Sequence, residues 1–445
     1  MKTPICDFVN EYIKRNPVRT HMPGHKGVGL LGIESFDLTE MEGADDLYHP
    51  EGIIKESEKN ASLIFGCDTC YSTEGSSQCI RAMMYLCSIY TAEKGEKLRV
   101  LAGRNAHKTF LSAAALLDIE VEWLVPKKMD SYLSVIIGTE ELESLFSSAE
   151  ILPHVLYLTD PDYLGNKVDV KAISSVCKKY GVLLAIDNAH GAYLKFLSPS
   201  QHPIDFGADI CCDSAHKTLP ALTGSAYLHI SDSAPIVFKN EVKNALSMFG
   251  STSPSYIILQ SLDKLNRYLS GGYKERLSKF IQKVEKLKAE LELNGYKFIG
   301  DEKIKLTFDA KKYGYEGDEL AEVLLEKNIV TEFHDKDYLV MMLTPETGDE
   351  GLRIIKNALL SIEKKSIVTD LPPKFTKSER KMSIREAMLT KREKLPVEKA
   401  EGRILAEASV GCPPAVPILV SGELITKEAI ECFKYYGINE IYVIK

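Results

Sequence analysis

The sequence lacks the features that mark several large classes of protein. No apolar run approaches the length needed to span a bilayer, and the opening Met1–Asp7 has no secretory apolar core. Positive charge is not in excess, since the formal net charge is -8. A nucleic acid partner usually requires a basic face, so we expect neither a nucleic acid partner nor a membrane role. A cytoplasmic location is expected.

The sequence also lacks a cysteine framework. Its ten cysteines are scattered, and the one metal-like spacing, Cys67 with Cys70, has no second pair or suitably spaced histidine group after it. His21 and His25 are four apart, but Pro23-Gly24 between them forbids an ordinary helix. We therefore expect free thiols and no metal site.

Length and composition are those of a globular protein with several domains. The chain has 445 residues, 44% hydrophobic and 27% charged, which is too long for one compact core. Changes in pattern divide it into an N-terminal segment that we expect to be irregular, a major domain, a small α+β domain and a C-terminal domain. The predicted boundaries are 1–60, 61–295, 296–366 and 367–445.

Short β-rich runs alternate with helical stretches between about residues 60 and 235. Six runs are predicted as strands, at 98–102, 121–125, 154–159, 182–187, 210–213 and 225–229. This alternation is typical of crossover units around a mostly parallel sheet. Ligands of such sheets bind beyond the carboxyl ends of the strands, which is where we expect the site.

A lysine and a carboxylate follow two of these runs. Lys217 lies among small and hydroxylated residues after the run that ends at Asp213, and Asp187 ends the run before it. Taken alone, a lysine is usually a solvated surface group and a strand-final aspartate is often a helix cap. Together they suggest a pyridoxal phosphate enzyme, in which an amine forms an imine with the cofactor and a carboxylate keeps the pyridine nitrogen protonated.

A phosphate site is predicted just before the helical stretch at 79–90. The segment 71–78 is rich in hydroxyl groups and contains Gly75 and Ser76, and a helix start favours negative charge. Ser214 and His216 flank the lysine loop and can add donors. The alternatives are a plain helix cap and groups that only satisfy loop backbone.

His107 lies between a strand end and a helix, in Gly103–Lys108. An aromatic side chain there could stack on the cofactor ring opposite the lysine and hydrogen-bond a substrate carboxylate. A lone histidine is more often structural, and both interpretations stay open on this residue alone.

With these residues assembled, the chain resembles the ornithine, lysine and arginine decarboxylases, in the shorter bacterial form without an N-terminal wing domain. The similar segments extend over nearly the whole chain: RTHMPGHKG at 19–27, DDLYHPEG at 45–52, GRNAHK at 103–108, DNAHG at 187–191, SAHK at 214–217, STSPSY at 251–256 and PPAVPILVSGE at 413–423.

The resemblance implies a fold and roles for residues. It implies α/β architecture of pyridoxal phosphate fold type I, with Lys217 as the imine lysine, Asp187 as the pyridinium partner and His107 as the stacking residue. Further expected contacts are Ala189 on the other ring face, His190 nearby, and Gly75, Ser76, Ser214 and His216 on the phosphate. Ser251 and Thr252 would reach the phosphate of a neighbouring subunit, which implies a homodimer with shared sites.

Two positions depart from the family pattern. Glu74 puts a carboxylate beside the expected phosphate, and Asp162 stands where the family tends to have threonine. A basic substrate needs a carboxylate in the pocket, and the candidates are Asp162, Glu423, Asp45 and Asp46. Arginine or lysine is favoured slightly over ornithine.

The implied reaction is decarboxylation of a basic amino acid to its amine, with Lys217 or His107 as the acid that reprotonates the α-carbon. The alternatives are other pyridoxal phosphate chemistry on the same fold, such as transamination, aldol cleavage or elimination, and a catalytically silent regulatory homologue.

Overall fold

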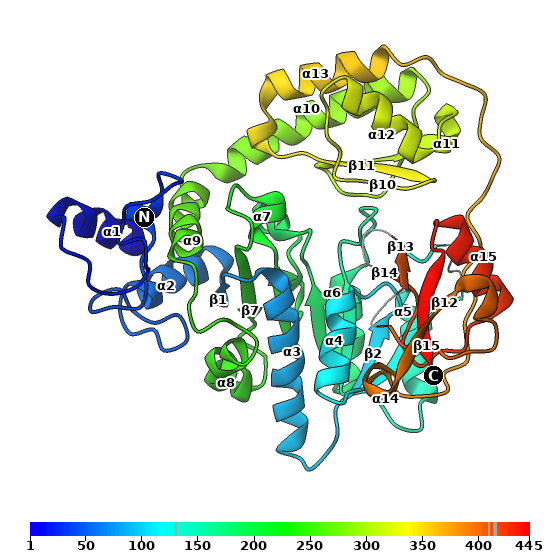
Figure 1. Cartoon of the computed structure of the whole chain (residues 1–445), viewed down its shortest axis with the longest axis horizontal. Helices are drawn as coiled ribbons and strands as arrows, with labels where there is room; N and C mark the ends of the chain where they lie inside the picture. Colours follow the sequence, from blue (N-terminus) through cyan, green and yellow to red (C-terminus); the bar gives the residue numbers. More distant parts are fainter. Residues whose placement is uncertain (128, 130, 408–409, 413–415) are drawn as a thin grey trace. The chain divides into compact units, whose positions relative to one another are not determined.

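The computed structural model describes residues 1–445 except 128, 130, 408–409 and 413–415. The chain, drawn in Figure 1, divides by its internal contacts into two compact units, each made of two stretches of sequence. Unit 1 comprises Met1–Glu96 and Leu183–Arg276, and unit 2 comprises Lys97–Val182 and Leu277–Lys445. Within the described residues, no helix combines the length and the apolar character that crossing a membrane requires.

Four strands form the sheet of unit 1. Their order is β1 (Asp68–Ser72), β7 (Ala226–Ile230), β6 (Ile210–Asp213) and β5 (Leu183–Asp187). β5 and β6 are parallel, whereas β7 is antiparallel to both of its neighbours. Because parallel strands end at the same edge, the residues that follow β5 and β6 lie close together.

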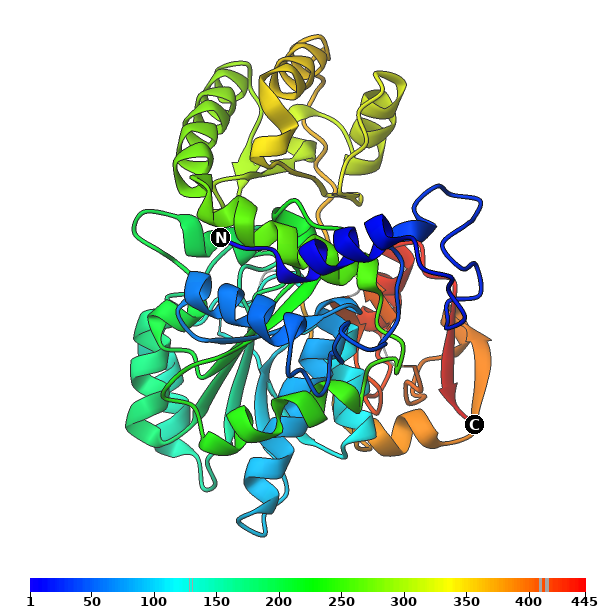
Figure 2. The same cartoon turned by 90° about the vertical axis from the view of Figure 1, so that its left-hand side faces the viewer.

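Helices of unit 1 pack in two groups. α3 (Gly75–Ala92) lies against β1, β6 and β7 and contacts α8 (Ile236–Ser247). α1 (Pro4–Arg15), α2 (Ile53–Phe65) and α9 (Tyr256–Ser270) pack on one another, and Figure 2 shows α1 in dark blue alongside α9.

The N-terminal segment is not irregular throughout, so that expectation is wrong for α1. Its buried residues Ile5, Val9 and Tyr12 recur at helical spacing, and Pro4 opens the helix. Proline at the first helical position and apolar residues at helical spacing are both sequence signals, so this helix could have been predicted.

Unit 2 contains three parallel strands in the order β4 (Val155–Thr159), β2 (Arg99–Gly103) and β3 (Glu120–Leu124). Helices α4 (Lys108–Leu116), α5 (Thr139–Ser148) and α6 (Val170–Tyr180) connect or follow them. The ends of α6 are set by local chemistry: the Asp169 carboxylate accepts from Ala172 N at 3.0 Å, and Gly181 ends the helix at φ 70.

A four-stranded antiparallel sheet forms the small α+β part of unit 2. Its order is β10 (Phe333–His334), β11 (Tyr338–Met342), β9 (Lys305–Asp309) and β8 (Phe298–Ile299). Figure 1 shows α12 (Gly317–Glu326), α13 (Gly348–Leu360) and the later part of α10 (Tyr273–Leu293) on one side of this sheet, with the short α11 (Ala310–Tyr313) beside them. Gly271-Gly272 separate α9 from α10, so the long helical region is two helices.

The C-terminal part of unit 2 has its own elements, α14 (Ile384–Leu389), β12 (Arg392–Pro396), β13 (Val410–Cys412), β14 (Val416–Leu419), α15 (Lys427–Tyr435) and β15 (Glu440–Ile444). Its core shares apolar residues with earlier sequence, since Leu405 and Phe433 pack in one cluster with Leu133 and Leu164. The first residues of the 413–423 motif, 413–415, lie outside the described residues.

Candidate active site

The lysine loop leaves the end of β6. Ser214 precedes the short helix α7 (Ala215–Thr218), and Lys217 lies inside it. The Lys217 amine is 2.9 Å from Nε2 of His190, which follows β5. Two segments that the sequence singled out separately therefore meet at one point.

Asp187 ends β5 opposite Cys212 of β6, and its side chain is buried. One carboxylate oxygen accepts from Ala189 N at 3.2 Å and lies 3.8 Å from the Cys212 thiol. Since β5 and β6 are parallel and adjacent, Asp187 and Lys217 lie at the same edge of the sheet.

The start of α3 can hold a phosphate. The helix has 18 residues and begins at Gly75 with φ 71, and it has no acidic residue in its first turn. A helix start presents N–H groups and a partial positive charge. The N–H of Gly75 itself donates to the carbonyl of Gly224 at 2.8 Å. Ser76 Oγ lies 2.8 Å from Ser214 Oγ, so the hydroxyls from α3 and from the lysine loop meet.

The space beside Gly75 fits a bound anion as well. A Cβ added at Gly75 would meet only His216 Cε1, at 4.0 Å, among the described residues. His216 Nδ1 lies 3.0 Å from the carbonyl of Ser225, whose own hydroxyl is buried and has no protein partner in the described part of the chain. The donor set and the open space at this helix start suit a phosphate ester.

Glu74 is directed to a neighbouring segment. Its Oε1 accepts from the backbone N–H of Ser251, in the segment predicted to reach a phosphate. The side chain is exposed in the single chain. The carboxylate thus has a partner of its own, although it directly precedes Gly75.

His107 belongs to unit 2, where it follows β2 and caps α4. Its Nδ1 accepts from Thr109 N at 3.2 Å and lies 2.9 Å from Thr109 Oγ1. An imidazole that accepts at Nδ1 carries its proton at Nε2 when neutral, so the hydrogen-bond pattern sets the tautomer.

Asp162 is also in unit 2 and is buried. Its two oxygens accept from the backbone and side-chain nitrogens of Asn166, both at 2.9 Å. Desolvation raises the pKa of its carboxyl above the usual range. The Asp162 carboxylate thus bonds within the local turn to Asn166. Its role toward a substrate stays a prediction.

Glu423 forms a buried ion pair in unit 2. Its Oε2 lies 3.1 Å from the Arg104 guanidinium and accepts from Val420 N at 2.8 Å. Arg104 also donates to the carbonyls of Pro417 and Ile418, at 2.8 and 3.0 Å. This arrangement ties the residue after β2 to strand β14, and nothing in the sequence marked Arg104 as the partner.

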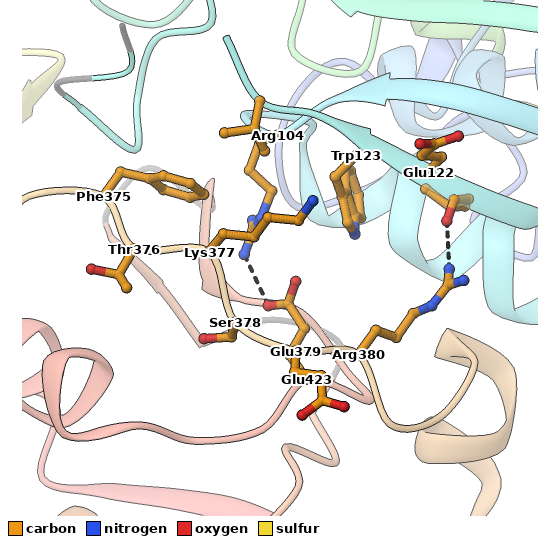
Figure 3. A pocket seen from close by; sticks show the side chains of 12 residues that line it. Arg104, Glu122, Trp123, Phe375, Thr376, Lys377, Ser378, Glu379, Arg380 and Glu423 are labelled. Carbon is orange, nitrogen blue, oxygen red and sulfur yellow. Dashed lines mark hydrogen bonds and ion pairs between the residues drawn. The ribbon is translucent and has the colours of Figure 1, made fainter. Parts of the chain in front are cut away.

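A cavity of about 310 Å³ lies beside this ion pair (Figure 3). Trp123 and Phe375 line it, and the Arg104 guanidinium is 5.4 Å from the ring of Trp123 and 5.9 Å from that of Phe375. Glu423 therefore faces a cavity with its charge already balanced by Arg104. Its predicted role as a substrate ligand remains a prediction.

Asp45 and Asp46 also have partners. Asp45 accepts from the backbone N–H groups of Glu51, Gly52 and Ile54, each at 2.9 Å, near the start of α2. Asp46 Oδ1 accepts from Tyr48 N at 2.7 Å. These contacts order the loop before α2.

Models of two protein domains match the chain. The first, described as Orn/Lys/Arg decarboxylase, major domain, matches residues 3–307. The second, described as Orn/Lys/Arg decarboxylase, C-terminal domain, matches residues 366–441.

Curated relatives are similar over almost their whole length. A protein named uncharacterized protein YaaO of Bacillus subtilis is 31% identical, over 97% of this chain and 93% of the relative. An arginine decarboxylase of the same organism is 29% identical, over 96% and 92%. An arginine decarboxylase of Halalkalibacterium halodurans is also 29% identical, over 96% and 91%.

Solved structures share the fold. The constitutive lysine decarboxylase of E. coli superposes with a TM-score of 0.79 at 17% identity, covering 100% of this chain and 82% of that one. Lysine decarboxylase A from Pseudomonas aeruginosa gives a TM-score of 0.81 at 17% identity, covering 99% and 80%. The predicted fold class is confirmed.

Proposed function

The chain belongs to the Orn/Lys/Arg decarboxylase family and is a decarboxylase of basic amino acids, and we propose that it acts on arginine with pyridoxal phosphate as cofactor. Support for arginine comes from relatives of that name, which are similar over nearly their whole length. The observation that carries the cofactor assignment is the contact of the Lys217 amine with His190, next to a helix start suited to phosphate.

The cofactor's contribution when bound is an electron-accepting ring that takes the electrons left by departing carbon dioxide. In this proposal Lys217 would hold the cofactor, Asp187 would keep the ring nitrogen protonated, and His107 and Ala189 would pack on the ring. Gly75, Ser76, Ser214 and His216 would hold the phosphate, and Ser251 and Thr252 would complete its site.

The proton for the α-carbon is assigned to Lys217 Nζ. His190 Nε2 lies 2.9 Å from this amine and can exchange a proton with it between turnovers. The Nε2–H of His107 is the alternative donor, and it can also bind the substrate carboxylate.

Asp162 and Glu423 are proposed to face the basic end of the substrate. Both are buried carboxylates, and a substrate guanidinium would share them with Asn166 and Arg104 respectively. A bidentate pair would favour arginine. The proposal also includes a cytoplasmic homodimer with shared sites, and the four domains keep the predicted boundaries 1–60, 61–295, 296–366 and 367–445.

A single substitution tests the cofactor assignment. Lys217→Ala should abolish release of carbon dioxide from arginine and remove the visible absorbance of the lysine-bound cofactor. The exposed Lys55→Ala, on α2, is the matched control and should keep both. An unchanged spectrum in Lys217→Ala would contradict the assignment.

Product analysis separates the alternatives. The purified protein is incubated with arginine, lysine and ornithine, and amine and carbon dioxide are measured. Formation of a keto acid would indicate transamination instead. A protein that stays colourless with added cofactor would indicate a silent homologue, for which Glu74 beside the phosphate site is the motivating residue.

A further inference from the structure

A cluster of fully buried ionisable side chains lies beneath the lysine loop in unit 1. Asp213 ends β6, and its Oδ2 lies 3.1 Å from Nε2 of His202 and 3.2 Å from Nε2 of His229. All three side chains are 0% exposed. None of the three belongs to the proposed active site.

The other oxygen of Asp213 binds the segment after β5. Asn188 Nδ2 donates to Asp213 Oδ1 at 2.6 Å, and Asn188 N donates to the carbonyl of Cys212 at 3.0 Å. Asn188 lies between Asp187 and Ala189 and two residues before His190. The Asp213 carboxylate thus joins the segment that carries Asp187 to the strand that leads to Lys217.

The hydrogen bond from Asn188 to Asp213 has the properties of a strong hydrogen bond. Burial by itself raises the pKa of a carboxyl, but the two imidazoles hold the pKa of Asp213 well below its usual range. A carboxylate that stays charged makes charge-assisted hydrogen bonds, which are shorter and stronger than neutral ones. The 2.6 Å bond to Asn188 fits this description.

The turn around Asn188 leaves little freedom for another arrangement. Gly191 N donates to the carbonyl of Asn188 at 2.8 Å, and a Cβ at Gly191 would come within 1.9 Å of Asn188 Oδ1. Glycine at 191 therefore lets the Asn188 amide turn toward Asp213.

We propose that Asp213 is a positioning residue that, braced by His202 and His229, fixes the Asp187–His190 segment against Lys217. It touches neither cofactor nor substrate and acts through Asn188. The inference rests on the proposed function, because it assigns Asp213 to the geometry of that same site.

A metal site is the rival interpretation. Ligand atoms of His202, Cys211 and Asp213 lie within 4.8 Å of one another, and all three residues are buried. Burial raises the pKa of the Cys211 thiol, however, and a protonated thiol is a poor ligand. The hydrogen-bond distance between His202 and Asp213 accounts for this pair without an ion.

The test compares two buried aspartates that join the same two strands at opposite ends. Asp209 precedes β6, and its Oδ2 accepts from Leu184 N at 2.8 Å. In Asp213→Asn the amide has one acceptor oxygen, which cannot serve both Asn188 and His202. Asp209→Asn is the matched control for loss of a buried charge.

The readout is binding of pyridoxal phosphate to the cofactor-depleted full chain, followed by absorbance and compared with the thermal midpoint. We expect Asp213→Asn to bind about tenfold more weakly, with a shifted visible band, whereas Asp209→Asn keeps wild-type affinity. Equal affinity and equal spectra for wild type and Asp213→Asn would overturn the inference. Equal losses in both variants would overturn it too.

Two further measurements keep the outcomes distinct. If Asp213→Asn fails to fold, Asn188→Ala removes the same bond from its other side and should show the same tenfold loss. Stoichiometric metal in the purified wild-type protein would overturn the inference in favour of a metal site. A wild-type chain that binds no pyridoxal phosphate would instead refute the proposed function.

Discussion

Buried carboxylates in this chain differ in what surrounds them, and the surroundings decide their charge. Asp213 is flanked by two imidazoles. Asp160 is also buried, but it has Asp162 and Glu302 nearby as well as Lys167. Desolvation, with these acids adding to it, raises the pKa of Asp160 to about 7. The contribution of Asp213 to folding stability is therefore lost as pH falls, whereas that of Asp160 is lost as pH rises.

Asp160 gives a pH-dependent prediction for stability. Its raised pKa means that the folded state holds a proton that the unfolded state releases above about pH 4. Protonated Asp160 contributes fully to the free energy of unfolding below that pH, and this contribution is lost as pH rises toward 7. Asp160→Asn keeps an acceptor for Val168 N, which donates to Asp160 at 2.7 Å, and removes this loss.

We expect Asp160→Asn to be more stable than wild type at pH 8, by up to about 4 kcal/mol at 1.36 kcal/mol per pKa unit, with the difference shrinking toward pH 4. Chemical denaturation at several pH values measures it. The exposed helix-cap variant Asp169→Asn is the control for the same substitution outside this buried cluster. A constant difference between Asp160→Asn and wild type across this range would contradict the interpretation.

At the scale of elements, the sequence was informative where a pattern repeats over several residues. Apolar runs located β4, β5 and β6 to within a residue or two, and Asp169 with Gly181 marks both ends of α6. The prediction missed α1, although its apolar residues recur at helical spacing, and it missed β1, whose residues 68–72 include three hydroxyls. Short elements are decided by packing against distant sequence.

The candidate site also contains features that depend on nearby sequence and features that depend on distant sequence. The positions of Lys217, Asp187 and Gly75 at strand ends and at a helix start could be predicted from residue types a few positions away, and their roles stay predictions. The partners of Asp213 could not, because His202 and His229 come from separate elements and meet only in the fold. Arg104 and Glu423 are 319 positions apart in the sequence, so their ion pair could not be predicted either.

The start of α3 gives a prediction for one element. Gly75 has φ 71, which favours glycine, and Gly181 at the end of α6 has φ 70. Alanine at either position costs about 1 kcal/mol or slightly more for the left-handed backbone. A Cβ at Gly181 has no atom within 4 Å among the described residues. Gly181→Ala is thus a control with the same backbone strain.

We expect both alanine variants to lose similar thermal stability and only Gly75→Ala to lose affinity for pyridoxal phosphate, by roughly tenfold, since its methyl group occupies the anion space. Melting curves and cofactor titration measure the two effects separately. Wild-type cofactor affinity in Gly75→Ala would mean that the phosphate binds elsewhere.

At the scale of the whole molecule, Ser251 and Thr252 have two possible arrangements: they serve the phosphate site of their own chain or that of a neighbouring subunit. Ser251 donates to Glu74 of its own chain, one residue before Gly75. Family resemblance instead assigns this segment to a neighbouring subunit. The two arrangements predict different behaviour when defective subunits are mixed.

Complementation between inactive subunits distinguishes these arrangements. One parent carries Lys217→Ala, and the other carries Ser251→Ala with Thr252→Ala. If sites are shared, a mixed dimer has one site with both defects and one with neither. Random pairing makes half of the dimers mixed, so about a quarter of wild-type decarboxylation should return.

If each chain serves its own phosphate, both sites of a mixed dimer are defective and no activity returns. A mixture of Lys217→Ala with Asp187→Ala is the control: both residues lie in unit 1 of one chain, at one sheet edge, so no complete site can form in either case.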